Sequence, residues 1–339
     1  MNTNTKKSVF CLACSNPVIR WGTNHASHVR YYCRICKKTF VSAQRRHGKR
    51  RPFQWYFKQY VLYGVSYAIL SRWSGYSIQH LHGHFTRILM QHPPQVILSQ
   101  EKDTETYLIL DGMWFGKRMC LMLYRQSKSK LILCASFMKR EFGSLIFKNL
   151  KEIHKKGYRF TGVVSDGGTG IRNAVIRMYG QIPHQICMAH IHRQATNSLG
   201  KYPKEERVRK LRTLADHMWH VESEEARVWW RDQVNAWIRT NGMYLGETRW
   251  DTTGHWWYIH AGVRKSVRAI KTAYEECFTF LDHPLMPKTT NEIEATIGNL
   301  SMKHLIHRGM KREKLQSFIG WFIYFYNRNI LSCRKTRED

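Results

Sequence analysis

Apolar residues recur with helical spacing in short stretches near the beginning of the chain. Pro52 suits the first turn of a helix over residues 53–63, and Gly64 is its expected end. A second helix is predicted over residues 66–73, ending near Gly75. Glycine is the residue that most often closes a helix, because it adopts the left-handed conformation without strain. The pattern therefore predicts two helices, each ended by a glycine.

A third helix is predicted after Ser77, which is a good N-cap residue. The apolar residues expected on one face of this helix are Ile78, Leu81, Phe85 and Ile88. Helix, glycine-containing turn and helix form the helix-turn-helix pattern, and an ordinary helical hairpin is the alternative. The exposed face would present side chains that donate hydrogen bonds to bases or phosphates, namely Gln79, His80, His82 and Arg87.

Further along, the pattern becomes that of strands. Apolar runs typical of strands occupy residues 107–110, 119–124, 131–137 and 160–165, and helical spacing returns at 145–156. Strands followed by a helix and another strand predict a mixed α/β unit.

Residues 194–285 are rich in helix-forming and charged residues, which predicts a mostly helical region. This region contains seven of the twelve tryptophans, namely Trp219, Trp229, Trp230, Trp237, Trp250, Trp256 and Trp257. Tryptophan usually packs in a core, so we favour core packing over stacking on nucleic-acid bases.

Two of the strand-like runs end in an aspartate, at Asp111 and at Asp166. Ligands of open α/β sheets bind beyond the carboxyl ends of strands, and Mg²⁺ prefers oxygen ligands. Either aspartate alone is better explained as a helix cap or a turn residue. As a pair in a chain whose helix-turn-helix pattern suggests DNA binding, they predict a divalent-metal site.

The charge of the chain narrows the class of partner. The 339 residues include 55 Lys+Arg and 24 Asp+Glu, which gives a formal net charge of +31. The first acidic residue is Glu101, so the first 100 residues hold 15 basic residues and no carboxylate. This excludes a carboxylate-based active site there and favours an acidic partner, most commonly nucleic acid. At 43% hydrophobic, the chain is too apolar to be a disordered basic tail.

No stretch approaches the ~20 apolar residues of a membrane span. The N-terminus also lacks the apolar core of a signal peptide. We therefore expect no membrane partner and a cytoplasmic location, associated with the nucleoid.

Four of the nine cysteines form two C-x-x-C pairs, Cys11 with Cys14 and Cys33 with Cys36, separated by 18 residues. Two such pairs at this spacing predict one structural Zn²⁺, since four thiolates leave no open position for water. A redox-active pair is the alternative. The odd total and this grouping favour a reducing compartment over a disulfide framework.

A basic run follows the cysteines and consists of Arg45, Arg46, Lys49, Arg50 and Arg51. Such a run is either a solvated linker or an arm that contacts phosphates or a minor groove. The acid-free surroundings favour contact with DNA.

A third carboxylate precedes a long apolar-periodic stretch. Asn291 followed by Glu294 fits a capping box, but a helix there would also hold Glu294 in a rigid position. Glu292 would point about 200° away from Glu294 around the helix axis, so only one of them can face a metal.

Cys187 and His190 have the spacing of metal ligands, but no second pair lies nearby. A buried cysteine and a hydrogen-bonded histidine are therefore favoured over a zinc site.

Four short motifs, in this order, resemble the bacterial Mutator-type DDE transposases of insertion sequences, particularly a subgroup with an N-terminal zinc ribbon. The motifs are Asp111-Gly-Met-Trp, Val164-Ser-Asp-Gly-Gly, Pro183-His-Gln-Ile-Cys-Met-Ala-His and Thr289-Thr-Asn-Glu-Ile-Glu. Trp256-Trp257 and His307-Arg308-Gly309 are also similar. The resemblance covers most of the chain from residue 107 to residue 327.

The resemblance implies an RNase H-like domain in which Asp111, Asp166 and Glu294 bind the metals. The family pattern Thr-Thr-Asn-x-Ile-Glu selects Glu294 over Glu292. It also implies a helical insertion within the 127 residues between Asp166 and Glu294.

The resemblance bears on two further pairs of residues. The pair Cys187 and His190 marks the same region in relatives. We add His307 and Arg308 to the predicted DNA-binding residues.

The expected fold class is multidomain, with an N-terminal zinc ribbon and helix-turn-helix before an α/β RNase H-like domain that an all-α insertion interrupts. The expected boundaries are 1–45 for the ribbon, 46–100 for the basic linker and helix-turn-helix, 101–194 for the first part of the core, 195–285 for the insertion, and 286–339 for the final core helices and basic tail.

The expected function is DNA transposition. The chain would bind terminal inverted repeats in double-stranded DNA, hydrolyse a phosphodiester, and join the freed 3′-OH to target DNA. Two Mg²⁺ (or Mn²⁺) ions about 3.5–4 Å apart would serve both oxygens of an in-line displacement. A homodimer or larger assembly is expected, because two ends must be joined. The alternatives are a DNA-binding regulator with an inert domain and a site-specific nuclease without joining activity.

Overall fold

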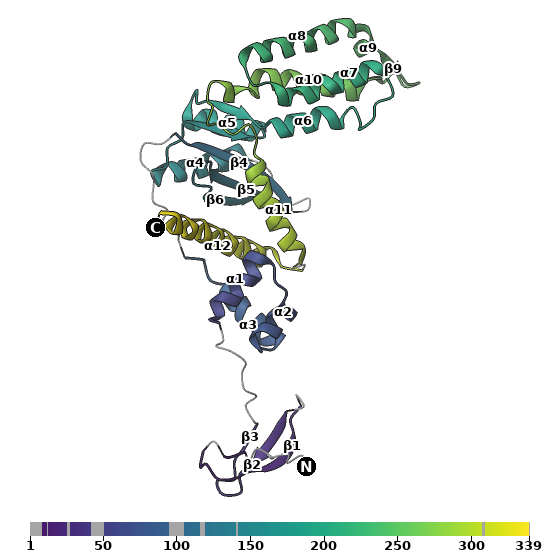
Figure 1. Cartoon of the computed structure of the whole chain (residues 1–339). Helices are drawn as coiled ribbons and strands as arrows, with labels where there is room; N and C mark the ends of the chain where they lie inside the picture. The colour runs from purple at the N-terminus through teal and green to yellow at the C-terminus, as the bar shows by residue number, and fades with distance from the viewer. Residues whose placement is uncertain are drawn as a thin grey trace, which may run out of the picture.

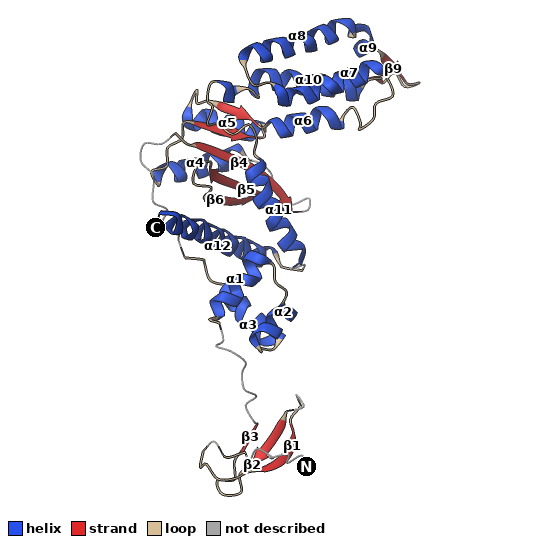
Figure 2. Ribbon diagram, viewed as in Figure 1, coloured by secondary structure: helices blue, strands red, loops and turns tan. Residues whose placement is uncertain are grey.

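The computed structural model describes residues 9–11, 13–25, 28–41, 51–94, 105–115, 119–139, 142–306 and 309–338. Along the chain, a small β unit and three helices precede an α/β body that carries a helical insertion (Figures 1 and 2). Several predicted DNA-binding residues lie outside the described residues, namely Arg45, Arg46, Lys49, Arg50, His307 and Arg308.

The N-terminal unit is a three-stranded antiparallel sheet of β1 (Ile19–Thr23), β2 (Val29–Tyr32) and β3 (Thr39–Val41). Tyr31 of β2 stacks on its cross-strand partner Phe40, with ring centroids 5.9 Å apart. So small a sheet has little apolar core, which is why such units commonly depend on a bound metal.

The three predicted helices are present as α1 (Phe53–Tyr63), α2 (Tyr67–Ser74) and α3 (Ile78–Leu89). Gly64 and Gly75 end α1 and α2 with φ of 70° and 69°, as predicted.

The N-cap of α3 is also as predicted, because the Ser77 side chain accepts a hydrogen bond from the backbone N–H of His80. The predicted apolar face of α3 is partly wrong. Ile78 is 46% exposed, whereas Leu89 is buried together with Leu81 and Phe85. These three residues are spaced by four and align along the helix, while Ile78 lies in the first turn.

A five-stranded mixed sheet forms the α/β body. Its strands are β4 (Tyr107–Phe115), β5 (Met119–Gln126), β6 (Ile132–Met138), β7 (Gly162–Ser165) and β8 (His184–Ile186). The spatial order is β6-β5-β4-β7-β8. Strands β4, β5 and β6 are antiparallel neighbours, whereas β7 and β8 continue the sheet in parallel with β4. The mixed α/β prediction is thus confirmed.

Each face of the sheet has its own apolar partners. Leu108 and Leu110 of β4 belong to the core formed with α4 (Gly143–Lys155) and α5 (Thr169–Tyr179). The alternate residues Tyr107 and Ile109 belong to the core that includes the two C-terminal helices. Because side chains alternate along a strand, Asp111 faces the second side.

The segment between β8 and the C-terminal helices contains the long helices α6 (Met188–Asn197), α7 (Glu206–His217), α8 (Glu224–Thr240) and α10 (Ala261–Glu276). Shorter helices are α9 (Gly242–Gly246), η1 (Met218–His220) and η2 (Thr279–Leu281). The expectation of an all-α insertion is wrong, because β9 (Thr248–Trp250) and β10 (Trp256–Tyr258) form an antiparallel hairpin. Asp251 and Gly254 form the turn that reverses the chain, and Gly254 has a φ of 81°.

The final helices are α11 (Asn291–Ile306) and α12 (Arg312–Glu338). Asn327 of α12 is buried and pairs with both backbone groups of Ile132 in β6, at 3.0 and 2.9 Å. Helix α12 also packs against the three-helix unit, because the ring of its Trp321 lies 5.3 Å from the ring of Phe57 in α1. A single helix therefore joins the three-helix unit to the sheet (Figure 1).

In the part of the chain that the structure describes, we find no helix of sufficient length and hydrophobicity to traverse a lipid bilayer.

Candidate metal centre and nucleic-acid interface

Asp111 and Asp166 lie at the same level of two adjacent parallel strands. Tyr107, Leu108 and Ile109 pair with the β7 residues 55 positions later, and Asp166 is 55 positions after Asp111. The prediction that Asp111 ends its strand is wrong, because β4 continues to Phe115 along β5. Strand β7 ends at Ser165, immediately before Asp166. The two carboxylates therefore lie at the same level, where β7 ends beside β4.

The carboxylate of Asp111 is 3% exposed and incompletely hydrogen-bonded. Oδ1 accepts from the N–H of Gly112 at 2.8 Å, whereas Oδ2 is buried with no partner at hydrogen-bond distance among the described residues. The Thr290 hydroxyl is near enough to favour the charged carboxylate, but it donates to Cys187. Burial raises the pKa of Asp111 to about 6, although the nearby His190 acts in the opposite direction. A buried carboxylate oxygen without a partner is costly unless a cation binds it.

Asp166 follows β7 directly and begins a glycine-rich turn. Its Oδ1 accepts from the N–H of Gly168 at 3.0 Å. One carboxylate oxygen of Asp166 thus stabilises the turn, which is the alternative role given above for this residue. Gly167 has φ of 77°, and a Cβ there would lie 2.9 Å from side chains of Arg172 and Ile186. The turn therefore needs glycine at this position, and it holds Asp166 at the end of the strand.

Glu294 projects from the first turn of α11. The capping box predicted from the sequence would make Asn291 the N-cap of this helix. In the structure Thr290 is the N-cap instead, because its carbonyl accepts from the N–H of Glu294 at 3.0 Å. The Glu294 carboxylate instead lies 3.3 Å from Arg193 Nη2 and 3.6 Å from His190 Nδ1.

In the structure, the third potential ligand beside Cys187 and His190 is Glu294. The ligand atoms of these three residues all lie within 4.8 Å of one another. Cys187 Sγ also accepts from the N–H and hydroxyl of Thr290, at 3.3 and 3.4 Å. Hydrogen bonds from His190 and Thr290 outweigh the effect of burial and lower the pKa of Cys187. The adjacent sulfur raises the pKa of His190 to about 9.

Three residues around these carboxylates escaped the sequence reasoning. Arg193 follows His190 by one helical turn, a spacing that could have marked it. Thr290 precedes the helix and bonds to Cys187, and Arg125 is a buried cation on β5 that pairs with Glu292, two positions before Glu294. Their roles depend on contacts between distant segments, such as the 101 positions that separate Arg193 from Glu294.

The four N-terminal cysteines also converge. The sulfur atoms of Cys11, Cys14, Cys33 and Cys36 all lie within 4.8 Å of one another. The Cys11–Cys36 and Cys14–Cys33 separations are 3.4 and 3.5 Å. A tetrahedral Zn²⁺ with bonds of about 2.3 Å separates its sulfurs by ~3.8 Å, so the cluster fits one zinc ion. A hydrogen bond from Asn16 lowers the pKa of Cys14 to about 6, whereas the neighbouring Cys11 thiol raises the pKa of Cys36. Thiols this close cannot all be ionised together unless a cation such as Zn²⁺ neutralises them.

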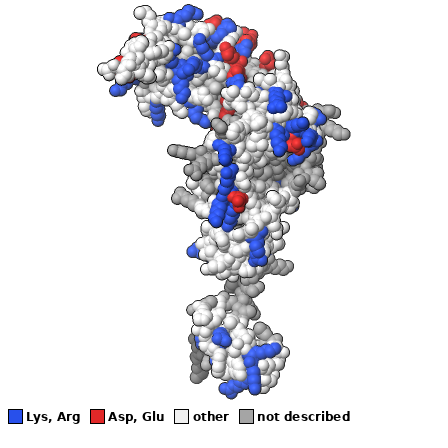
Figure 3. Space-filling model, turned by 180° about the vertical axis from the view of Figure 1, so that it is seen from behind, with Lys and Arg blue, Asp and Glu red and all other residues white. Residues whose placement is uncertain are grey.

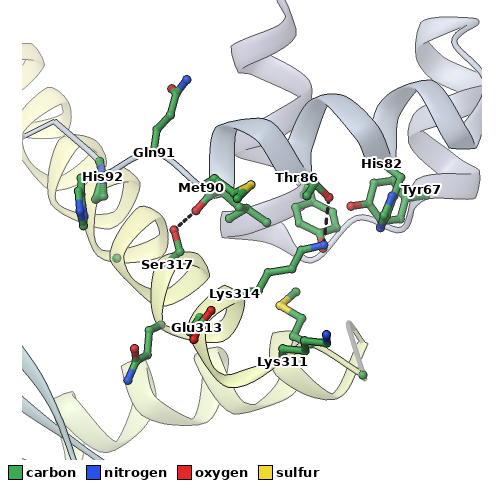
Figure 4. Close-up of a pocket in the computed structure, with 17 residues that line it drawn as sticks. Tyr67, His82, Thr86, Met90, Gln91, His92, Lys311, Glu313, Lys314 and Ser317 are labelled. Atoms are coloured by element: carbon green, nitrogen blue, oxygen red, sulfur yellow. Dashed lines mark hydrogen bonds between the residues drawn. The ribbon is translucent and has the colours of Figure 1, made fainter.

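The predicted DNA-reading residues of α3 are all exposed, but they do not share one face. His80 and Arg87 lie about 20° apart around the helix axis. His82 lies on another side, where it contacts Tyr67 and lines a cavity of about 960 Å³ between α3 and α12 (Figure 4). Lys314 reaches across from α12 and donates to Thr86 at 3.1 Å. Arg51, just before α1, is exposed as well.

No protein-family profile matches the chain, and no curated protein matches its sequence. Among solved structures, one that is similar is the Drosophila P element transposase strand transfer complex, at 10% sequence identity. The alignment covers 83% of this chain and 94% of that chain, with a TM-score of 0.42. At this TM-score the similarity supports no assignment of function.

Proposed function

We propose that the chain is a DDE-type transposase of the Mutator type. The five-stranded sheet would be its RNase H-like core, with Asp111, Asp166 and Glu294 as the metal-binding triad. The observation that carries this proposal is the register of β4 and β7, which gives Asp111 and Asp166 a common level at one sheet edge. Glu294 is linked to the same place through His190, which interacts electrostatically with both Asp111 and Glu294.

The chemistry of the three carboxylates suits a hard divalent cation such as Mg²⁺ or Mn²⁺. Asp111 contributes a buried oxygen without a hydrogen-bond partner in the described part of the chain. Among the described residues, however, the ligand atoms of Glu294 group with those of Cys187 and His190 and not with the two aspartates, so a bound ion would have to draw Glu294 toward them. Two such ions, when bound, would activate a water and neutralise the developing charge on the reacting phosphate.

The protein itself would contribute rigidity and charge. Asp111 lies within a paired strand, and Asp166 is held by a glycine turn. Arg193 and His190 are close enough to orient Glu294. Since the nucleophile is water in the first reaction and a DNA 3′-OH in the second, no protein nucleophile is required.

Recognition of DNA would fall to the zinc ribbon and the three-helix unit. Their basic residues and the absence of acids before Glu101 suit a polyanion. Lys and Arg are also spread over the surface of the body and the insertion (Figure 3). The domain boundaries given above, the binding of terminal inverted repeats, and a homodimer or larger assembly belong to the same proposal.

The test uses DNA that carries the inverted repeats flanking the coding sequence. With Mg²⁺, the protein should cleave such ends and join a pre-cut 3′-OH end to a target. Asp111→Asn, Asp166→Asn and Glu294→Gln should each abolish both reactions and leave end binding intact. Glu275→Gln, an exposed acid on α10, is the matched control and should keep activity. Full activity in any triad variant would overturn the assignment, and cleavage without joining would reduce the proposal to a nuclease.

A further inference from the structure

The β9–β10 hairpin presents tryptophan to solvent. Trp250, Trp256 and Trp257 are 63%, 46% and 41% exposed, whereas Trp230 and Trp237 of the same insertion are buried. The expectation that the tryptophans of this region pack in a core is therefore wrong for the hairpin, and also for Trp229 of α8, which is 53% exposed. Large exposed apolar side chains that gather in one place usually mark a binding surface.

The hairpin has two different faces. Trp250 and Trp256 are cross-strand partners, with ring centroids 6.3 Å apart on one face. Trp257 lies opposite Arg249 on the other face, where the His255 ring stacks beside it at 5.9 Å. Asp251 Oδ1 accepts from the N–H groups of Thr253 and His255, so the turn between the strands is braced. Each face thus holds preformed aromatic surface beside an arginine, which is Arg249 on the face of Trp257 and Arg264, stacked on Tyr258, on the face of Trp256.

A basic helix continues from the hairpin toward the carboxylates. Helix α10 has no acidic residue before Glu275, and its exposed cations include Lys265, Arg268 and Lys271. Its last residue, Glu276, pairs with Arg172, which in turn donates to the carbonyl of Gly167 beside Asp166. At 1.5 Å per residue, α10 spans about 24 Å between these two places.

We propose that the hairpin binds unpaired bases of DNA by stacking on its tryptophans, while the cations of α10 contact the adjoining phosphates. Aromatic rings beside a positively charged track are the usual arrangement for single-stranded nucleic acid, because every base has a stacking face. A duplex hides those faces, so the hairpin distinguishes unpaired from paired DNA. The choice of DNA as the nucleic acid rests on the proposed function.

The test measures the binding of the full-length protein to a fluorescent thymidine strand about 20 nucleotides long. Fluorescence anisotropy is recorded without Mg²⁺ and at about 0.3 M salt, which suppresses purely electrostatic binding. Trp250→Ala and Trp256→Ala should each weaken single-strand affinity about tenfold. Trp256→Phe should retain most of the affinity. Trp229→Ala removes a comparably exposed tryptophan on α8 and should change nothing.

Binding of duplex ends should be unaffected by the hairpin variants, which shows that they fold. Unchanged single-strand affinity in Trp250→Ala and Trp256→Ala would overturn the proposal. The proposal would also be overturned if these variants changed the oligomeric state, measured by light scattering, without losing single-strand binding. The hairpin would then be an interface between copies of the chain. The assay measures binding and requires no cleavage. Its result can therefore be interpreted even if the proposed catalytic function is wrong.

Discussion

Glu292 and Glu294 stand two positions apart on α11 and contact different cations. Glu292 lies 3.0 Å from Arg125, whose side chain is only 4% exposed, whereas Glu294 lies 3.3 Å from Arg193. The helix therefore directs one carboxylate to a structural ion pair and the other to the side of His190.

This difference separates the two glutamates in function. Glu294→Gln should abolish strand transfer, since the neutral amide lacks the negative charge with which a carboxylate holds a divalent cation. Glu292→Gln should keep the activity but lower the thermal unfolding midpoint by a few degrees, because Arg125 loses its partner. Glu292 is half exposed, so the cost should be only about 1 kcal/mol. Loss of joining activity in a folded Glu292→Gln protein would show that the assignment is reversed.

The four-cysteine cluster predicts one zinc ion per chain. Metal analysis of protein purified without chelators should give one zinc, and Cys33→Ser should lose it, because three thiolates bind zinc more weakly than four. Cys333→Ser, which changes an exposed cysteine on α12, should keep the zinc. Binding to duplex ends should weaken only in Cys33→Ser. A zinc-free protein that binds those ends normally would contradict this prediction.

Asn327 should be important for stability. Asn327→Ala leaves the N–H and carbonyl of Ile132 without partners in the core, and each unpaired group costs about 1–3 kcal/mol. We expect a loss of about 2–4 kcal/mol, seen as a lower thermal unfolding midpoint. Asn329→Ala, two residues along the same helix, removes a partly exposed bond from Lys58 and an exposed bond to the Tyr63 hydroxyl, and it should cost much less. Equal losses in both variants would mean that the pairing with β6 is unimportant.

His184 should make the stability depend on pH. Burial lowers its pKa to about 4, with the charge of Arg172 acting in the same direction, and its ring bonds to Ser165 at 2.9 Å. The unfolded chain binds a proton near pH 6.5, so the folded state loses stability as the pH falls from about 6.5 to about 4. The full effect should be about 3 kcal/mol.

Thermal unfolding midpoints measured across this pH range provide the test. His184→Gln should flatten the profile, even if its stability at neutral pH is lower. His217→Gln, which changes an exposed histidine on α7, should leave the slope unchanged. An identical acid profile in the His184 variant and the wild type would disprove the assignment.

The sequence by itself determined the local structure. Gly64, Gly75 and Ser77 set helix ends through their own backbone conformation and nearest hydrogen bonds, so they could be recognised without knowledge of the fold. Short continuous runs of apolar residues likewise indicated the strands. The spacing of Cys11, Cys14, Cys33 and Cys36 indicated their cluster, because the chemistry of a shared metal restricts the pattern.

Only the tertiary structure decided what meets across long separations. The register of β4 with β7 brings Asp111 level with Asp166, and helix α11 brings Glu294 to Cys187 and His190. These neighbours depend on how whole elements pack, which residues near them in the chain do not specify. Exposure has the same origin, since one amino acid, tryptophan, lies in the core at position 230 and faces solvent at position 250.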